Sequence, residues 1–127
     1  MSLLTMARKG FMQAYNISKE PVTVRRISGV TRNSQDDVSL TVAGSDSQYA
    51  KVVHKDNIEE LKLESGIMGD ADVVMYFPWD YTSGLVTGNY ITYNSNNYRI
   101  ERVAPQNLSS GLVFTKVFLK ETDETFS

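Results

Sequence analysis

The chain has 127 residues, of which 41% are hydrophobic and 22% are charged, and its formal net charge is −2. These proportions are typical of an ordinary folded domain and exclude the disordered class, which combines low hydrophobicity with high charge. A nearly neutral chain does not suit a protein dedicated to duplex DNA, which must neutralise many phosphates. No apolar run approaches the ~20 residues of a membrane-spanning helix, so we expect no membrane partner.

The sequence contains no cysteine and a single histidine, His54. A chain without cysteine has no disulfide, no thiolate metal site and no cysteine nucleophile, which suits a cytosolic protein. A Ser-His-Asp arrangement would need His54, and the neighbouring sequence does not place a nucleophile on a sharp strand-to-helix turn. We therefore expect no metal, no cofactor, no small-molecule substrate and no enzymatic activity.

Charges are unevenly distributed along the chain. The first 35 residues contain six basic residues and one acidic residue, whereas residues 36–72 contain nine acidic and three basic residues. A molecule with a basic part and an acidic part attracts copies of itself, as neighbours in a ring do. The alternative is that solvated faces differ in sign by chance, and the sequence alone leaves both interpretations open.

Residues 3–16 have the apolar spacing of an amphipathic helix, with Leu4, Phe11 and Tyr15 on one side and Lys9 on the other. A helix of this length is marginal when isolated, because nucleation is unfavourable and few hydrogen bonds follow it. We therefore expect the helix to dock on the chain's own sheet or on a neighbouring molecule.

From residue 21 the pattern changes to the period of two that is typical of strands. The predicted strands cover residues 22–27, 38–43, 49–53, 71–77, 89–93, 97–103 and 112–120. Turns or bent connections are predicted at 29–37, 44–47 and 105–111. The segment 56–63 fits either a helical turn or a strand.

These elements predict a mainly β fold: a small antiparallel β-barrel or sandwich of about six strands with an N-terminal α-helix. The connections are too short for parallel crossovers, so neighbouring strands should be antiparallel. No repeat or long linker divides the chain. We expect one domain over residues 1–127, with the helix at 3–16, the barrel at 21–120 and an acidic, frayed tail at 121–127.

Two groups of aromatic residues are candidates for binding. Trp79 and Tyr81 follow Pro78 in a loop between predicted strands, where large aromatics serve as interface anchors if exposed or fold back as a lid on the core. Further along, Arg99 and Arg102 alternate with tyrosines, as in barrels that stack single-stranded nucleic acid beside a cationic groove. The second pattern is also that of a plain core strand.

Residues 88–105, GNYITYNSNNYRIERVAP, predict a hairpin whose turn contains Asn94, Ser95 and Asn96. The strand that ends in Tyr-Phe-Pro, the loop after it and this hairpin resemble the closing half of the small head-completion, or head-tail connector, proteins of tailed bacteriophages and prophages. The residues that match the family's motif are Gly88, Tyr98, Ile100 and Val103. Asn89 stands where the family more often has Asp, and Ser95 where it often has Gly.

The resemblance implies a β-barrel or sandwich with a peripheral helix, assembled as a homo-oligomeric ring between the portal and the tail proteins. Such a ring seals or gates the channel through which DNA passes without sequence-specific binding, and it performs no catalysis. Its location is the virion, or the host cytoplasm during assembly. On this basis we expect the helix and the aromatic loop to contact other subunits or the portal. The candidate partner-binding residues are Leu4, Phe11, Trp79 and Tyr81.

Two alternatives stay open. A tail-terminator or tail-completion subunit would be the same kind of structural protein, docked one layer further down. A single-stranded nucleic-acid-binding module, similar to the oligonucleotide-binding fold, would instead use Arg99 and Arg102, and its binding would depend strongly on salt.

Overall fold

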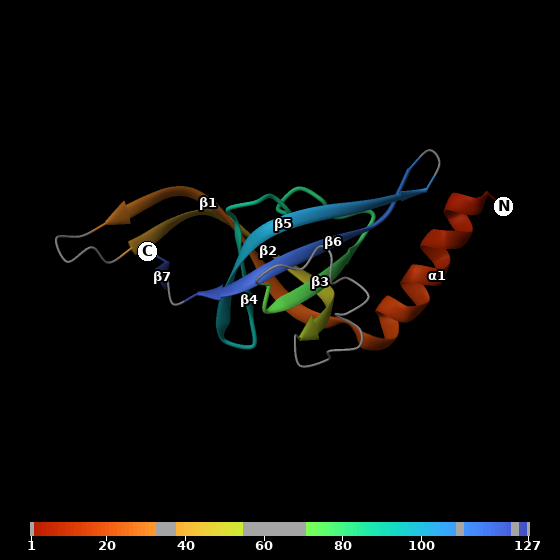
Figure 1. Ribbon diagram of the computed structural model, residues 1–127, viewed down its shortest axis with the longest axis horizontal. Coiled ribbons are helices and arrows are strands. Elements are labelled where there is room, and N and C mark those ends of the chain that lie inside the picture. Colours follow the sequence, from red (N-terminus) through yellow and green to blue (C-terminus); the bar gives the residue numbers. More distant parts are fainter. Residues whose placement is uncertain (1, 33–37, 55–70, 109–110, 123–124, 127) are drawn as a thin grey trace.

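The computed structural model describes residues 2–32, 38–54, 71–108, 111–122 and 125–126. Within these residues the chain forms one helix and seven strands (Figure 1). They are α1 (Leu3–Ser18), β1 (Glu20–Arg32), β2 (Val38–His54), β3 (Val73–Pro78), β4 (Tyr90–Tyr93), β5 (Asn96–Leu108), β6 (Gly111–Thr122) and β7 (Thr125–Phe126). The segment 56–63, predicted as a helical turn or a strand, lies outside the described residues.

The N-terminal helix is confirmed, and both of its ends have a local cause. The Ser2 side chain caps α1 by accepting a hydrogen bond from the Thr5 N–H at 3.1 Å. The helix ends at Ser18, two residues later than predicted, where the Lys19 N–H donates to the Tyr15 carbonyl. The helix packs across one end of the sheet, chiefly against β6 (Figure 1).

All strands belong to one sheet with the order β1-β4-β5-β6-β3-β2-β7, and β1 also pairs with β2. The strands from β1 to β2 in this order are antiparallel to their neighbours, so the extra pairing closes them into a ring. β7 adds to β2 as a parallel strand. The structure thus confirms a mainly β, antiparallel fold of about six strands with an N-terminal helix.

Apolar side chains from all six strands of the ring fill its interior. Among the largest fully buried side chains of this core are Met75, Phe77, Ile91, Ile100 and Leu119. Because side chains alternate between the two faces of a strand, the neighbours of these residues lie on the outer face of the ring. Tyr81 and Leu85, from the loop between β3 and β4, belong to the same core.

The β4–β5 hairpin has the tight turn that its asparagine-rich sequence predicts. Asn94 and Ser95 have φ values of 53° and 68°. Positive φ at both central residues gives a backbone twist that matches the twist of the two strands. The resulting register pairs Ile91 with Tyr98, and both side chains enter the core.

The turn predicted at 44–47 is wrong, because this polar segment lies inside β2. Gly44 pairs with Arg26, and Ser47 pairs with Thr23. Gly44 had suggested a change of chain direction. The register shifts on either side of Ile27, in the paired strand β1, bend the two strands here without a turn. Pairing with β1, which is not visible in the local sequence, decides the conformation here.

The turn predicted at 105–111 is too long. Pro105 lies in β5 opposite Thr115, and Leu108 lies opposite Gly111. Among the described strands only β6 borders β5 at these residues, and proline is tolerated where a strand has a free edge.

The tail, predicted to fray from residue 121, has regular structure in its described part. β6 continues to Thr122, and β7 pairs with Ser39 and Leu40 of β2. The ring of Phe126 lies edge-on against Tyr90, with the ring centroids 5.6 Å apart. The prediction rested on acidic composition and missed the apolar contact that holds Phe126 in place.

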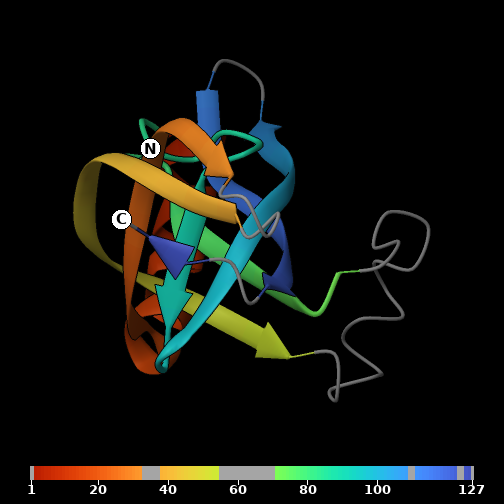
Figure 2. The same ribbon diagram turned by 90° about the vertical axis from the view of Figure 1, so that its left-hand side faces the viewer.

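The molecule has two distinct ends. Beyond residue 26, β1 and β2 leave the ring together as a two-stranded arm, formed by residues 27–32 and 38–42 (Figures 1 and 2). The arm and β7 lie at one end, and α1 lies at the opposite end (Figure 1). In the described part of the chain, no helix has both the length and the apolarity that a membrane crossing requires.

Candidate interaction surfaces

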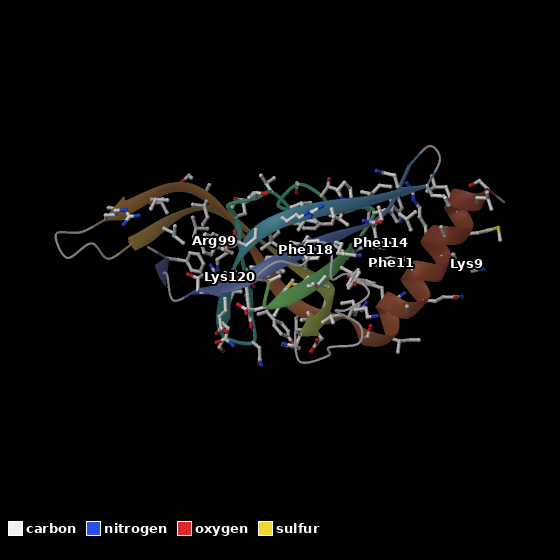
Figure 3. The ribbon with its side chains drawn as sticks, viewed as in Figure 1. Lys9, Phe11, Arg99, Phe114, Phe118 and Lys120 are labelled. Carbon is white, nitrogen blue, oxygen red and sulfur yellow. The ribbon has the colours of Figure 1, made fainter. Side chains whose placement is uncertain are left out.

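One side of α1 is docked on the outer face of the ring. Phe11 stacks on Phe114 of β6 with ring centroids 4.9 Å apart and planes inclined by 11° (Figure 3). Tyr15 is buried, and its hydroxyl donates to the Tyr49 carbonyl at 2.7 Å. Burial, reinforced by Asp80 and Tyr49, raises the pKa of Tyr15. This side of the helix is therefore an internal interface of the chain.

Leu4 and Phe11, two of the predicted partner-binding residues, lie on this docked side. A Cβ atom at Gly111 would come within 2.7 Å of Leu4 Cδ2, so the start of β6 lies against the helix. Phe11 contacts both Tyr15 and Phe114. The described contacts of Leu4 and Phe11 are therefore with the chain's own sheet and helix.

Arg8 connects the helix to the loop that carries Trp79. Its Nε donates to the Leu112 carbonyl at 2.8 Å, and its Cζ lies 4.0 Å from the centroid of the Trp79 ring. Trp79 remains 40% exposed. The exposed anchor predicted in this loop is thus partly accessible and held by a cation–π contact.

Tyr81, the other predicted anchor in the loop, is buried. Its hydroxyl donates to Asp46 Oδ2 at 2.9 Å, and Arg26 Nη1 lies 3.3 Å from the same oxygen. Burial, followed by the hydrogen bond to Asp46, raises the pKa of Tyr81 far above its ordinary value. A Cβ at Gly84 would come within 2.5 Å of this hydroxyl. The sequence left two roles open for the aromatic residues of this loop, a lid on the core or an exposed anchor. Tyr81 folds back onto the core, as in the first role, whereas Trp79 is partly exposed at the surface, as in the second.

The residues of the family motif have structural positions in the hairpin. Tyr98 and Ile100 are 4% and 0% exposed in the core, and Val103 packs against it. Gly88 has a φ of 96°, where glycine is favoured, and its N–H donates to the Ile100 carbonyl at 3.1 Å. The motif therefore describes how the hairpin closes on the core, and it does not describe a binding surface.

Asn89 has a structural role that the sequence analysis missed. Its Oδ1 accepts from the Ile27 N–H and its Nδ2 donates to the Gly84 carbonyl, both at 3.1 Å. Its own carbonyl accepts from the Ile100 N–H at 2.9 Å. One amide side chain thus joins β1, the aromatic loop and the hairpin. The only signal in the sequence is that a side chain with both a donor and an acceptor follows Gly88.

Arg99 and Arg102 lie on the same outer side of β5, because their partners Lys120 and Phe118 are two residues apart on β6. Figure 3 shows Arg99, Lys120 and Phe118. Arg99 Nη2 lies 2.7 Å from Glu101 Oε1. Arg102 is exposed, with its Cζ 5.9 Å from the centroid of the Phe118 ring.

The tyrosines that were to provide a stacking platform beside these arginines are buried. Tyr90, Tyr93 and Tyr98 are 3%, 8% and 4% exposed. The Tyr93 hydroxyl donates to Glu20 Oε1 at 2.8 Å. Base stacking needs an open aromatic face. Tyr93 and Tyr98 belong to the core cluster, which favours the plain core interpretation for these two, and the ring of Phe126 lies against Tyr90.

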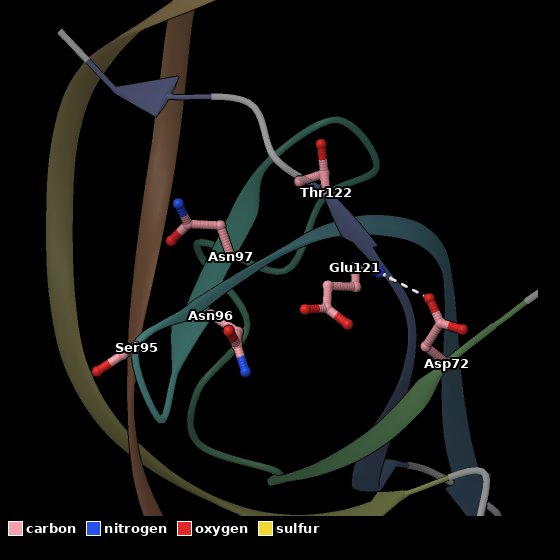
Figure 4. Close-up of a pocket in the computed structure, with 6 residues that line it drawn as sticks. All are labelled: Asp72, Ser95, Asn96, Asn97, Glu121 and Thr122. Carbon is pink, nitrogen blue, oxygen red and sulfur yellow. Dashed lines mark hydrogen bonds between the residues drawn. The ribbon is translucent and has the colours of Figure 1, made fainter.

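A polar pocket of about 630 Å³ lies next to the β4–β5 turn (Figure 4). It is lined by Asp72, Ser95, Asn96, Asn97, Glu121 and Thr122. Asp72 Oδ2 accepts from the Glu121 N–H at 2.9 Å, so one of the two carboxylates already bonds the backbone. No group of three or more metal-ligating side chains occurs among the described residues. The pocket is open and polar, and the side chains that line it are two carboxylates, two amides and two hydroxyls.

The side of α1 that faces away from the ring is uncovered and mainly apolar, with the exposed Gln13 one turn after Gly10 on the same side. Leu3, Met6 and Ile17 are 68%, 54% and 88% exposed. A Cβ at Gly10 would meet no atom within 4 Å. We call the three apolar residues and Gly10 the free face of α1, and Lys9 flanks it (Figure 3). The sequence analysis missed this face, although spacings of three and seven residues place its members on one side of a helix.

The chain was compared with protein-family models and with curated proteins, and neither comparison gives a match.

Proposed function

We propose that the chain is a structural subunit of a tailed-phage or prophage head-tail connector, which assembles into a ring between portal and tail and performs no catalysis. The observation that carries this proposal is the free face of α1, where Leu3, Met6 and Ile17 expose apolar side chains to solvent. Contiguous exposed apolar surface marks sites of interaction with other proteins. DNA passes through the ring without sequence-specific contacts, in the virion or in the host cytoplasm during assembly.

Gly10 supports a docked partner on this face. Glycine in the interior of a helix is destabilising by about 1 kcal/mol relative to alanine. No described atom of the chain approaches the position that a Cβ would occupy at Gly10. The chain's own packing therefore does not explain the glycine, whereas the backbone of a partner lying close to the helix would.

The positive charge of α1 also supports a partner on the free face. Arg8 and Lys9 are the charged residues of α1, and the helix has no acidic residue. A partner surface with carboxylates around an apolar centre would complement the free face and its flanking Lys9. The sequence of residues 36–72 has an acidic balance, so a copy of the same chain meets this requirement as well as a portal subunit does.

The single-stranded nucleic-acid alternative receives less support. Arg99 is paired with Glu101 at 2.7 Å, and Tyr90 and Tyr98 are nearly fully buried. A tail-completion subunit would use the same free face, and locating the protein in virions by electron microscopy would distinguish the head side from the tail side.

The test is the mass in solution across a concentration series, measured by light scattering at low and moderate salt, with and without a short single-stranded oligonucleotide. We expect rings, or a salt-sensitive equilibrium towards them, that do not respond to the oligonucleotide. The double variant Met6→Gln and Ile17→Gln should shift this equilibrium to the monomer with an unchanged circular dichroism spectrum. The matched control is Val86→Gln, because Val86 is 54% exposed but lies outside α1.

Two results would contradict the proposal. Wild-type protein that stays monomeric at every concentration, and shows no rings by electron microscopy, would remove the connector interpretation. A monomer whose mass increases only with the oligonucleotide would favour the nucleic-acid-binding module instead.

A further inference from the structure

The second interaction surface lies at the opposite end of the molecule from α1, where β7 meets β2 (Figures 1 and 2). β7 consists of two residues, which pair in parallel with Ser39 and Leu40. A strand this short contributes few backbone hydrogen bonds, and the Phe126 ring adds contacts with Tyr90 and Arg25.

Phe126 lies against an aliphatic, an aromatic and a cationic residue: Leu40, Tyr90 and Arg25. We call these three residues the tail site. The Phe126 ring lies edge-on to Tyr90 at 5.6 Å, and Arg25 Cζ lies 4.8 Å from the centroid of the Phe126 ring. Leu40 and Tyr90 are 2% and 3% exposed. Tyr90 pairs with Arg25 across the β1–β4 ladder, so two neighbouring strands form this site.

Tyr90 lies on the outer face of the ring, since the next residue of β4, Ile91, belongs to the core. The tail site, which Phe126 covers in this structure, is therefore approached from outside the ring. It accepts an aromatic side chain, through the edge-on contact with Tyr90 and the cation–π contact with Arg25.

The charges of the tail and of its site are complementary. In the sequence, Glu121, Asp123 and Glu124 precede Phe126 within five residues. Arg25 belongs to the site, whereas Arg99, on β5 opposite Tyr90, is already paired with Glu101. This complementarity acts equally on a tail of the same molecule and on a tail of another copy.

We propose that the tail site joins copies of this chain, with Phe126 of one copy in the tail site of the next. The exchange makes in trans the contacts seen within one chain, so it loses no contact energy. Each copy offers one tail and accepts one. Such a head-to-tail contact generates a ring when the rotation closes. This inference rests on the proposed self-assembly, and copies held together through α1 raise the local concentration of tails.

The experiment is disulfide trapping in the full chain, which has no native cysteine. One batch of protein carries Ser39→Cys and a second carries Thr125→Cys, at two positions that pair across β2 and β7. Paired residues on neighbouring strands are about 5 Å apart, which a disulfide can span. The batches are mixed, oxidised and separated on a non-reducing gel. The matched control replaces Ser39→Cys with Thr31→Cys, because Thr31 pairs with Ser39 from the other side.

Tail exchange predicts a covalent dimer in the mixture of Ser39→Cys with Thr125→Cys, and little in the control mixture. Adding Phe126→Ala to the Thr125→Cys protein should lower the yield of dimer by about tenfold, because the aromatic contacts hold the tail. A third protein, which carries both Ser39→Cys and Thr125→Cys on one chain, is the positive control. A disulfide in this protein shows that the two cysteines react when β7 pairs with β2.

Exchange is overturned if the doubly substituted protein forms only an intramolecular disulfide and the mixture gives no covalent dimer. It is also overturned if neither sample crosslinks, since β7 then does not pair with Ser39. Light scattering on the untreated samples separates this inference from the proposed function. Rings without trapped dimers would refute tail exchange alone, whereas trapped dimers without rings would refute the connector assembly alone.

Discussion

Arg8 binds the helix to the loop at Trp79: its Cζ lies 4.0 Å from the centroid of the Trp79 ring while its Nε donates to the Leu112 carbonyl. The contact joins α1, the aromatic loop and β6 at one edge of the docked helix. Because Trp79 is still 40% exposed, part of its ring is accessible beside the contact with Arg8. We therefore treat Trp79 as a second candidate contact of the proposed assembly, separate from the free face of α1.

The first prediction concerns Trp79→Ala. Loss of a partly exposed cation–π contact should lower the free energy of unfolding by about 1 kcal/mol, with a small fall in Tm. Assembly should weaken by much more, because aromatic anchors contribute heavily to interfaces. Calorimetry gives the first quantity and light scattering the second. A collapse of the fold would show that Trp79 serves the core rather than a partner.

The second prediction concerns Gly84→Ala. A Cβ at this position would come within 2.5 Å of the Tyr81 hydroxyl and 2.7 Å of Val24 Cγ1, and both side chains are packed in the core. Overpacking of this kind is destabilising by about 1–3 kcal/mol. Urea unfolding measures the loss.

Gly29→Ala is the matched control for this substitution, since a Cβ at Gly29 would meet no atom within 4 Å. Equal stability of the Gly84→Ala protein and the wild type would mean that the loop moves freely and that Tyr81 is not fixed by Asp46.

Local elements of the fold are predictable from the sequence, whereas its closure is not. Helical spacing locates α1, and the asparagines locate the β4–β5 turn, because both signals act over a few residues. The pairing of β1 with both β2 and β4 joins distant segments, so no local pattern reveals it. The same reason explains why Gly44 was assigned to a turn.

The candidate site was only partly predictable. Leu4 and Phe11 were identified because apolar helical spacing points to a buried side, and that side faces the chain's own sheet. Leu3, Met6 and Ile17 follow a second stripe on the same helix, and only burial shows that it has no cover. Tyr81 and Trp79 have the same local context, and a distant carboxylate, Asp46, draws one of them inward.

The third prediction concerns Tyr93→Phe and alkaline pH. Burial, followed by the hydrogen bond to Glu20, raises the pKa of Tyr93 from 10.0 to about 12. The folded state therefore favours the neutral phenol, and its contribution to stability is complete below about pH 10 and is lost as the pH rises through 12. Phenylalanine does not ionise, so Tyr93→Phe should lose less stability over this interval.

At neutral pH the same substitution should lower the free energy of unfolding by about 1 kcal/mol, because the hydrogen bond to Glu20 is lost. Urea midpoints at neutral pH and near pH 11 test both statements. Burial also raises the pKa of Tyr15, Tyr81 and Tyr98, so the alkaline loss should shrink and not vanish. Identical pH profiles for the two proteins would contradict the assignment to Tyr93.

The last prediction separates folding from assembly at Gly10. Alanine fits there without contact, because a Cβ at Gly10 would meet no atom within 4 Å. Gly10→Ala should therefore raise the free energy of unfolding of the monomer by about 1 kcal/mol through helix propensity.

If a partner lies close to the helix at this point, the added methyl group pushes it away, and assembly should weaken although the subunit is more stable. Asn16→Ala is the control, because Asn16 is exposed on the same helix but, six residues from Gly10, lies off the free face, so alanine raises helix propensity there without filling the space at Gly10. Unfolding curves and light scattering on both variants give the answer. A Gly10→Ala protein that is more stable and assembles as well as the wild type would show that no partner backbone approaches the free face at this residue.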